Sequence, residues 1–390
     1  MMMRSTLFTL LVSMLLILPG CGGSGGDAES TPVIIGVHYN LSGFQSGIDI
    51  PSAQGARLAV AEINRLGGVL GRDLQMVLED GKSQPEVIRQ QAIGLFKDYP
   101  SITASMGFSD TDMVLAAAPV AASHGRLFLT SGATSPHLPT QVPTYLFLAC
   151  FGDNVQAAAG AEWAYDALAV RKVAILYDTT KSYTQLLQAY FRTRFESLNG
   201  RVVSTQGFSS KDQLTEAARS VGDADLVFLS AAAPEDIVTG IQALRRTGFS
   251  GPILGGDGFD AEPIWRQHPE FDRVYFTTHA YLGADNPDPR VTAFRKAYAE
   301  DYPDSPVDAF AALGYDTVYL LAAAITRAQS SKPDEVMMAL ANIKRFEGVT
   351  GTIAYPDGSR IPSKSVSIIH IEAGRRRLVN QSVPVSVPSP

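Results

Sequence analysis

Short apolar runs alternate with helical patterns along most of this chain, and that alternation constrains the fold more than any other feature. The first run, 33–37, is Val-Ile-Ile-Gly-Val, a continuous β-branched segment typical of a strand buried on both faces. A helical pattern at about 53–66 and a second strand at 74–79 follow. Regular strand–helix alternation predicts parallel sheets with right-handed crossovers, and therefore an α/β fold.

The alternation falls into two successive sets of similar length. The first set closes with an apolar strand at 145–150, and the second runs from a helix at 155–168 to a strand at 252–254. We therefore expect two similar lobes rather than one long sheet. After a strand at 274–278, long helices are expected at 290–302 and 308–329, then a closing strand at 366–372. The basic triplet 375–377 reads as a solvated turn, and the proline-rich end of the chain reads as disordered.

Composition and motifs argue against several functions. The 390 residues carry 32 basic and 39 acidic side chains, a net charge of −7 that disfavours a nucleic-acid partner. Gly67, Gly68 and Gly71 follow a helix and precede a strand, whereas a dinucleotide-binding fingerprint needs the reverse order. The six histidines are dispersed, and no nucleophile elbow or phosphate-binding loop is present. We expect no enzyme activity, no cofactor and no metal.

The N-terminus has the pattern of an export signal. Arg4 precedes an apolar run at 7–18, too short to span a bilayer, and Leu-Pro-Gly-Cys follows at 18–21. This pattern resembles the lipobox of bacterial lipoproteins. It predicts a signal peptide over 1–20, lipidation of Cys21 and a flexible tether over 21–32, with membrane contact through the lipid alone. A secreted chain without lipid is the alternative. Cys150 then has no cysteine to pair with and is expected to be a buried thiol.

A stretch of small polar residues, 130–135, follows the strand expected at 126–129. Ligands of parallel α/β sheets bind at the carboxyl ends of strands. Thr130, Ser131 and Thr134 offer hydroxyls, and Gly132 allows a ligand close to the backbone. These groups could hold a carboxylate or phosphate without a formal cation. An ordinary strand-to-loop turn uses the same residue types and remains the alternative.

Over residues 33–375 the chain resembles type I periplasmic solute-binding proteins of the branched-chain amino acid class. The resemblance combines several segments in a specific order: the opening strand 35–37 with 41–43, the segments 55–56, 61–64 and 67–68, Gly107 with Thr111, the segment 134–136, residues 177–178 with Tyr183, and 256–258. It implies two lobes joined by three hinge crossings near 150–153, 280–285 and 352–357. Lobe one would hold 33–150 with 281–352, lobe two 151–280 with 353–379, and 380–390 would be a disordered tail.

The resemblance also implies a ligand site between the lobes. Thr111, Thr134 and a backbone amide of Gly132 or Ala133 would hold the ligand's carboxylate. Asp257 would meet its ammonium group, and Tyr183 would close over it. Ile48, expected in the first loop, would flank the ligand's side chain, although a core role is equally compatible. A second aromatic residue of the family falls on Ala232, which leaves room for a ligand other than a branched aliphatic amino acid.

The function implied is capture of a small amino acid or related carboxylate outside the cytoplasm, by a monomer that delivers it to an ATP-driven permease. A sensing or protein-interacting lipoprotein on the same fold is the alternative, since a fold does not fix a function. The chain shows no DNA-binding module or second apolar span that would serve as an output domain.

Overall fold

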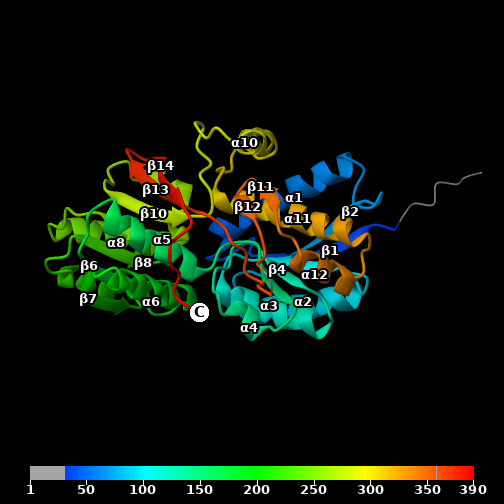
Figure 1. The fold of residues 1–390 in the computed structure, drawn as a ribbon, viewed down its shortest axis with the longest axis horizontal. Helices are drawn as coiled ribbons and strands as arrows, with labels where there is room; N and C mark the ends of the chain where they lie inside the picture. The colour runs from blue at the N-terminus through cyan, green and yellow to red at the C-terminus, as the bar shows by residue number, and fades with distance from the viewer. Residues whose placement is uncertain (1–30, 357) are drawn as a thin grey trace, which may run out of the picture.

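Two α/β lobes lie side by side along the long axis of the molecule (Figure 1). The structure is a computed structural model, and it describes residues 31–356 and 358–390. The predicted signal peptide and the lipidation residue Cys21 lie outside the described residues, as does most of the predicted tether. The predicted two-lobed fold with mostly parallel sheets is confirmed.

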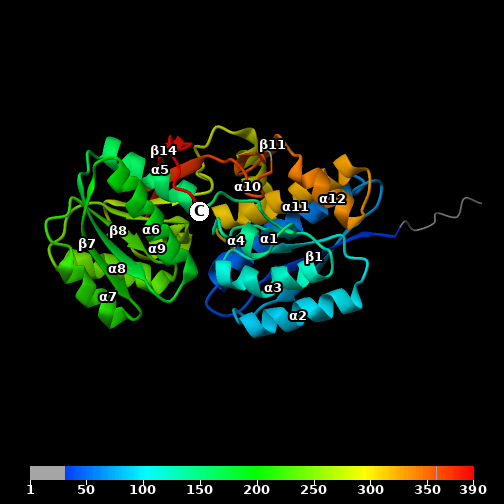
Figure 2. The ribbon, with the colours of Figure 1, turned by 60° about the horizontal axis from the view of Figure 1, so that its bottom comes forward.

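The first lobe is built on a fully parallel sheet of five strands in the order β2-β1-β3-β4-β5. Helices α1, α11 and α12 cover one face of this sheet, and α2 and α3 cover the other (Figure 2). The elements of this lobe are β1 Val33–Tyr39, α1 Ser46–Arg65, β2 Leu74–Asp80, α2 Pro85–Asp98, β3 Ala104–Gly107, α3 Thr111–Ser123, β4 Phe128–Thr130, α4 Leu138–Gln141, β5 Leu146–Leu148, α10 Pro289–Asp301, α11 Ala309–Ala328, α12 Pro333–Ala341, and the hairpin β11 Phe346–Gly348 with β12 Gly351–Ile353.

The second lobe has a seven-stranded sheet in the order β14-β13-β10-β9-β8-β6-β7. Its strands are parallel except β13 and β14, which are added antiparallel at one edge. The elements are α5 Asp153–Asp166, β6 Lys172–Asp178, α6 Ser182–Ser197, β7 Arg201–Phe208, α7 Lys211–Ala217, β8 Leu226–Ser230, α8 Pro234–Arg246, β9 Ile253–Gly255, α9 Glu262–Gln267, β10 Val274–Thr278, β13 Val366–Glu372, β14 Arg375–Ser382, and 3-10 turns at 218–220 and 257–259.

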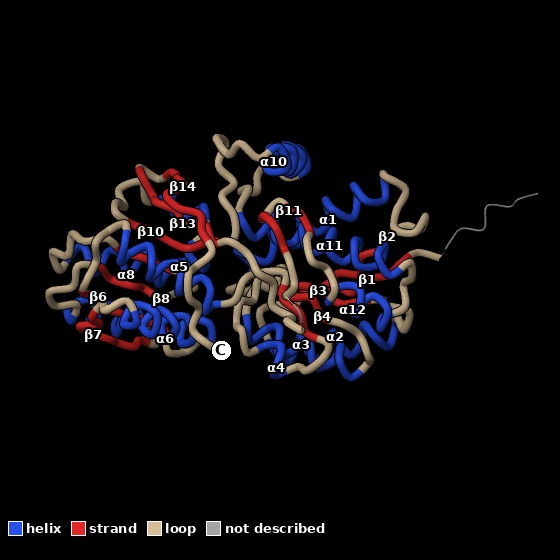
Figure 3. Tube along the Cα trace, viewed as in Figure 1, coloured by secondary structure: helices blue, strands red, loops and turns tan. Residues whose placement is uncertain are grey.

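The chain crosses between the lobes three times, through loops that Figure 3 shows in tan. The first two crossings follow β5 and β10. The third lies later than 352–357, because the segment beyond β12 stays on lobe one. There the Leu148 N–H, at the edge of the first sheet, donates to the Arg360 carbonyl at 3.0 Å, and Ala354 forms a bridge to Ser363. The passage into lobe two comes after residue 363.

Two expectations near the C-terminus differ from the structure. The triplet 375–377 begins strand β14 instead of a turn, and Arg376 forms an ion pair with buried Asp260 at 2.7 Å. The tail was expected to be disordered, yet the structure places it along α5. The N–H groups of Val385 and Ser386 donate to the Glu162 carboxylate at 2.9 and 3.2 Å. A partly buried carboxylate with spare acceptors therefore gives the tail a definite path.

Helix α1 begins earlier than predicted, at Ser46 rather than about 53. Pro51, which the prediction placed before the helix, lies inside it. Pro51 has no backbone N–H to donate within the helix. The next residue, Ser52, donates its hydroxyl to the Ile48 carbonyl at 3.1 Å. As a consequence Ile48 lies on this helix and not in the preceding loop.

Helices α1 and α11 pack backbone to backbone. A Cβ on Gly55 would lie 1.9 Å from the Ala311 carbonyl oxygen, and one on Gly314 would lie 1.9 Å from that of Ser52.

Among the described residues α11 is the one helix long and apolar enough to cross a membrane, but 78% of its most apolar window is buried in the protein. Its composition is therefore explained by this packing.

We predict that Gly314→Ala lowers the free energy of unfolding by about 2–4 kcal/mol, because backbone atoms cannot yield to the added methyl group. Gly94→Ala is the matched control: it lies in α2 with nothing within 4 Å of its added Cβ. Alanine there should stabilise the protein by about 0.5–1 kcal/mol. Urea unfolding of both variants measures the difference, and equal effects would contradict the close packing.

Candidate functional site

The N-terminal ends of α3 and α6 meet at the junction between the lobes. The Ser182 hydroxyl of α6 donates to the Asp112 carboxylate of α3 at 2.7 Å. Close by, the Lys181 ammonium lies 4.2 Å from the centre of the Phe44 ring. Thr111, a predicted site residue of lobe one, precedes Asp112 in the sequence. Tyr183, a predicted site residue of lobe two, follows Ser182. The structure therefore brings these two predicted residues into the same region.

Thr111 is positioned by the turn from β3 into α3. Asp110 caps this helix, its carboxylate accepting the N–H groups of Asp112 and Met113 at 2.9 and 3.2 Å. Thr111 is 3% exposed, and its hydroxyl is buried without a hydrogen-bond partner among the described residues. Such a group is unfavourable unless something else bonds to it.

The polar stretch after β4 is held mainly by its own lobe. The Ser131 hydroxyl bonds to the Tyr39 hydroxyl at 3.1 Å. The N–H of Gly132 donates to the Phe108 carbonyl at 3.2 Å, and that of Ala133 to the Thr130 hydroxyl at 3.1 Å. Both amides predicted to bind a ligand are thus already used within the lobe. Thr134 is buried, and its backbone carbonyl accepts the N–H of Asp153 at 2.6 Å. Thr134 therefore contacts the first crossing.

Asp257, directly after β9, is buried at 4% exposure and accepts three hydrogen bonds. The donors are Gln156 Nε2 at 2.6 Å, the Tyr183 hydroxyl at 2.8 Å and His279 Nε2 at 3.0 Å. Burial lowers the pKa of His279 despite the neighbouring carboxylate. No lysine or arginine in the described part of the chain forms an ion pair with Asp257. The structure therefore brings Tyr183 and Asp257 into contact, and the Asp257 carboxylate is held by neutral donors.

The first turn of α5 adds two residues that the sequence reasoning missed. Gln156 Nε2 also donates to Asp153 at 3.0 Å, and its oxygen accepts from the Thr277 hydroxyl at 2.8 Å. Asp153 is fully buried, and burial, then the charge of Asp257, raise the pKa of Asp153 to about 8. The signal was an Asp and a Gln three residues apart, one helical turn, directly after the first crossing.

His279 is the third residue that was missed. Its ring stacks on Phe151 of the first crossing, with centroids 3.9 Å apart. Its Nδ1 is buried without a hydrogen-bond partner among the described residues, as is the Thr111 hydroxyl. No group of three or more potential metal ligands occurs in the described residues.

Two further predicted positions take core roles. Ile48 is half-buried and packs against the cluster beneath α2 and α3. Cys150 is a buried free thiol, as expected, and its Sγ lies 3.3 Å from the Ala133 carbonyl. Burial raises the pKa of this thiol well above its usual range, so it is not a reactive group.

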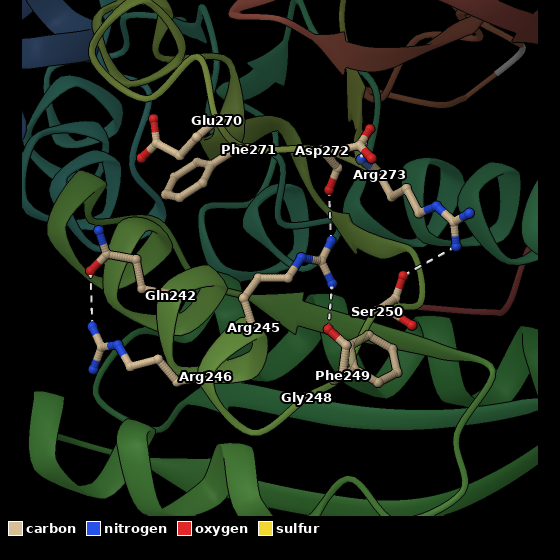
Figure 4. Close-up of a pocket in the computed structure, with 10 residues that line it drawn as sticks. All are labelled: Gln242, Arg245, Arg246, Gly248, Phe249, Ser250, Glu270, Phe271, Asp272 and Arg273. Carbon is tan, nitrogen blue, oxygen red and sulfur yellow. Dashed lines mark hydrogen bonds between the residues drawn. The ribbon is translucent and has the colours of Figure 1, made fainter.

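A cavity of about 730 Å³ lies elsewhere, on lobe two (Figure 4), and its lining includes none of the predicted residues. The Arg245 guanidinium in it donates to three backbone carbonyls, those of Phe249, Gly251 and Asp272, at 2.6–3.0 Å. Arg273 likewise donates to the Ser250 carbonyl at 3.2 Å. These arginines are occupied in holding loops.

The molecule has two lobes built on mostly parallel sheets and joined by three crossings. Polar residues from both lobes meet at the junction. This architecture is that of a two-lobed binding protein. Comparison with known proteins gives its family: a family model described as periplasmic binding protein matches residues 32–375, and the chain belongs to this family. The Leu/Ile/Val-binding protein BraC3 of Rhizobium johnstonii is 26% identical over 347 residues, covering 88% of this chain and 92% of that protein.

Solved structures agree with this assignment. LivJ of Streptococcus pneumoniae, in complex with isoleucine, is 26% identical with a TM-score of 0.80, covering 92% of this chain and all of that one. LivK of Thermotoga maritima is 28% identical with a TM-score of 0.80, covering 90% and 99%. A solute-binding protein of R. palustris in complex with benzoate shares the fold at 18% identity and a TM-score of 0.76, covering 92% and 98%. These relatives are solute-binding proteins and not enzymes, as predicted.

The raised pKa of Asp153 gives a pH-dependent stability. Between the usual pKa of 3.8 and about 8, the folded protein holds a proton that the unfolded chain has lost. The free energy of unfolding therefore falls as pH rises through this window, by up to about 1.4 kcal/mol per pH unit from this residue. We predict that Asp153→Asn flattens this slope in urea unfolding of the ligand-free protein between pH 5 and 8. Glu300→Gln, on the exposed face of α10, should leave the slope unchanged.

Proposed function

We propose that this protein captures a small amino acid or a related carboxylate between its lobes and delivers it to an ATP-driven permease. The observation that carries the proposal is the buried, unpartnered hydroxyl of Thr111 at the start of α3, opposite Tyr183 on lobe two. A helix N-terminus favours anions, since its free N–H groups and dipole are positive there. The ligand's carboxylate would bind at this end of the junction.

The ammonium group of the ligand would bind at the opposite end. Asp257 has both acceptor positions of one oxygen filled, by Gln156 and Tyr183, whereas its other oxygen accepts from His279 alone. Asp153 lies next to it through the shared Gln156 amide. A cation placed here would favour the charged form of Asp153 and compensate the burial of both carboxylates.

Closure would place the two halves of the site on the ligand. The contacts between Ser182 and Asp112, and between the Tyr190 hydroxyl and His137 Nε2 at 3.2 Å, join the lobes on either side of the junction. A ligand that adds bonds across this junction shifts the hinge equilibrium towards the closed form. The closed form is then the state that a permease recognises.

The bound ligands of solved relatives support the proposal at the level of chemical class. LivJ is in complex with isoleucine, and the R. palustris protein is in complex with benzoate. Each of these two ligands carries a carboxylate. We test the class by isothermal titration of the purified protein with amino acids and with their deaminated analogues. Binding of amino acids supports the proposal, and binding of neither series would contradict it.

A matched pair of variants separates the two ends of the ligand. We predict that Asp257→Asn weakens amino acid binding by about 2–4 kcal/mol, because the ammonium loses a buried charged partner. Binding of a deaminated analogue should not weaken. Thr111→Val should weaken both ligands by about 1.5–3 kcal/mol, the value of a hydrogen bond to a charged group. Titration measures each, and Thr326→Val, exposed at the end of α11, is the control.

We also propose that Cys21 is lipidated and holds the protein on the outer side of a membrane. The short apolar run before Leu-Pro-Gly-Cys supports this, together with the glycine-rich segment after it. We predict that labelled palmitate is incorporated into the full chain in its native host. Cys21→Ser should abolish the labelling, whereas Cys150→Ser should not. Labelling of the Cys21→Ser variant would contradict the anchor.

A further inference from the structure

A second cavity, of about 870 Å³, lies beside the second crossing, and both lobes contribute to its wall. Lobe two supplies the end of α9 and the turn between β13 and β14, whereas lobe one supplies α10 and the loop from α10 to α11. The crossing itself supplies residues 282–284. In Figure 1, β14 and α10 lie along the upper edge of the molecule, away from α3 and α6 at the lower edge. The cavity is therefore distinct from the candidate site, and its volume suits a small ligand.

The charged side chains of this wall are mostly arginines. The described residues of the lining include Arg266, Arg295, Arg375 and Arg376, with Asp304 as their one acidic member. The chain as a whole has a net charge of −7. An acidic protein thus gathers four arginines around one cavity, and such a wall favours a negatively charged ligand over a cation.

Arg376 holds this wall together and is not available to a ligand. Its Nη1 donates to the Asp260 carboxylate at 2.7 Å, and its Nη2 donates to the Val307 carbonyl at 2.9 Å. The second bond ties β14 of lobe two to the loop before α11 of lobe one. The turn before β14 also packs on α9, since a Cβ on Gly374 would lie 2.8 Å from the Trp265 carbonyl oxygen. The start of β14 is therefore fixed in place at the cavity.

Arg295 on α10 and Arg375 at the start of β14 have no such partners. Neither forms an ion pair with a described residue, and Arg295 Nε is buried without a hydrogen-bond partner among them. Asp285 lies close enough for its charge to act on Arg295, but its Oδ1 accepts the Tyr281 hydroxyl at 2.5 Å. A buried guanidinium N–H is unfavourable unless an acceptor binds to it. One arginine from each lobe is thus left to bind an acceptor in this cavity.

We propose that the cavity binds a small anion with two or more negative charges, of the phosphate or polycarboxylate class, through Arg295 and Arg375. The planar fork of guanidinium N–H groups matches the oxygens of such anions. One anion oxygen would satisfy Arg295 Nε, and another would bind Arg375. Because these arginines belong to different lobes, the bound anion would link the lobes and favour one hinge angle over others. The inference does not depend on what the interlobe junction captures.

The test is isothermal titration of the purified protein with sodium phosphate and with sodium citrate, at pH 7.5 and constant ionic strength. Sodium acetate is the monovalent comparison. At least one of the two polyvalent anions should bind about 10-fold or more tightly than acetate. Arg295→Gln and Arg375→Gln should each weaken that binding about 10-fold or more. Arg327→Gln, which removes an exposed arginine of α11 outside the cavity, should leave it unchanged. Urea unfolding shows that each variant folds.

Three results would overturn the inference. If neither phosphate nor citrate binds more tightly than acetate, the cavity is not a site for polyvalent anions. If an anion binds but both arginine variants keep the natural affinity, it binds elsewhere on the protein. If only one of the two variants loses affinity, the anion is held by a single lobe, and the proposed link between the lobes is wrong.

Discussion

The structure of the junction depends on satisfying the buried carboxylate of Asp257 without an arginine or lysine. Three neutral donors do this: Gln156 from α5, Tyr183 from α6 and His279 after β10. They come from three elements of the second lobe, so one carboxylate fixes how those elements meet. Neutral donors leave the negative charge uncompensated, and a cationic group of a ligand can then gain from it. A permanent ion pair with arginine would have removed that gain.

The same polar contacts extend into the hinge. Gln156 bonds to Asp153 at the first crossing, and Asp153 in turn donates its N–H to Thr134 on lobe one. At the third crossing, the buried Lys364 ammonium reaches the Thr350 hydroxyl at 2.6 Å and the Ala149 carbonyl at 3.4 Å. Burial lowers the pKa of Lys364 to about 8, opposed by the charge of Asp316. Residues of the candidate site and of the crossings therefore share hydrogen bonds, and such a shared network can couple closure to binding at the site.

Much of the fold followed from patterns local in sequence. The apolar run at 33–37 predicted a buried strand, and the helical pattern at 308–329 predicted the buried helix α11. The errors came where distant residues decide the outcome. The tail follows α5 because Glu162 accepts its amides, and segment 354–363 stays on lobe one because Leu148 bonds to Arg360. The start of α1 was missed because Pro51 is tolerated inside the helix.

The sequence by itself determined the α/β class and the positions of Thr111, Thr134, Tyr183 and Asp257 after strands or at helix starts, since period and turn chemistry are local properties. The tertiary structure decided which of these groups are available. It satisfies the amides of Gly132 and Ala133 within lobe one, and it buries the carboxyl groups of Asp49 and Asp153. Burial and hydrogen bonding depend on residues far apart in the chain, such as Gln156 and Asp257, which are 101 positions apart. No local pattern encodes them, because desolvation arises only when the packed lobes exclude water.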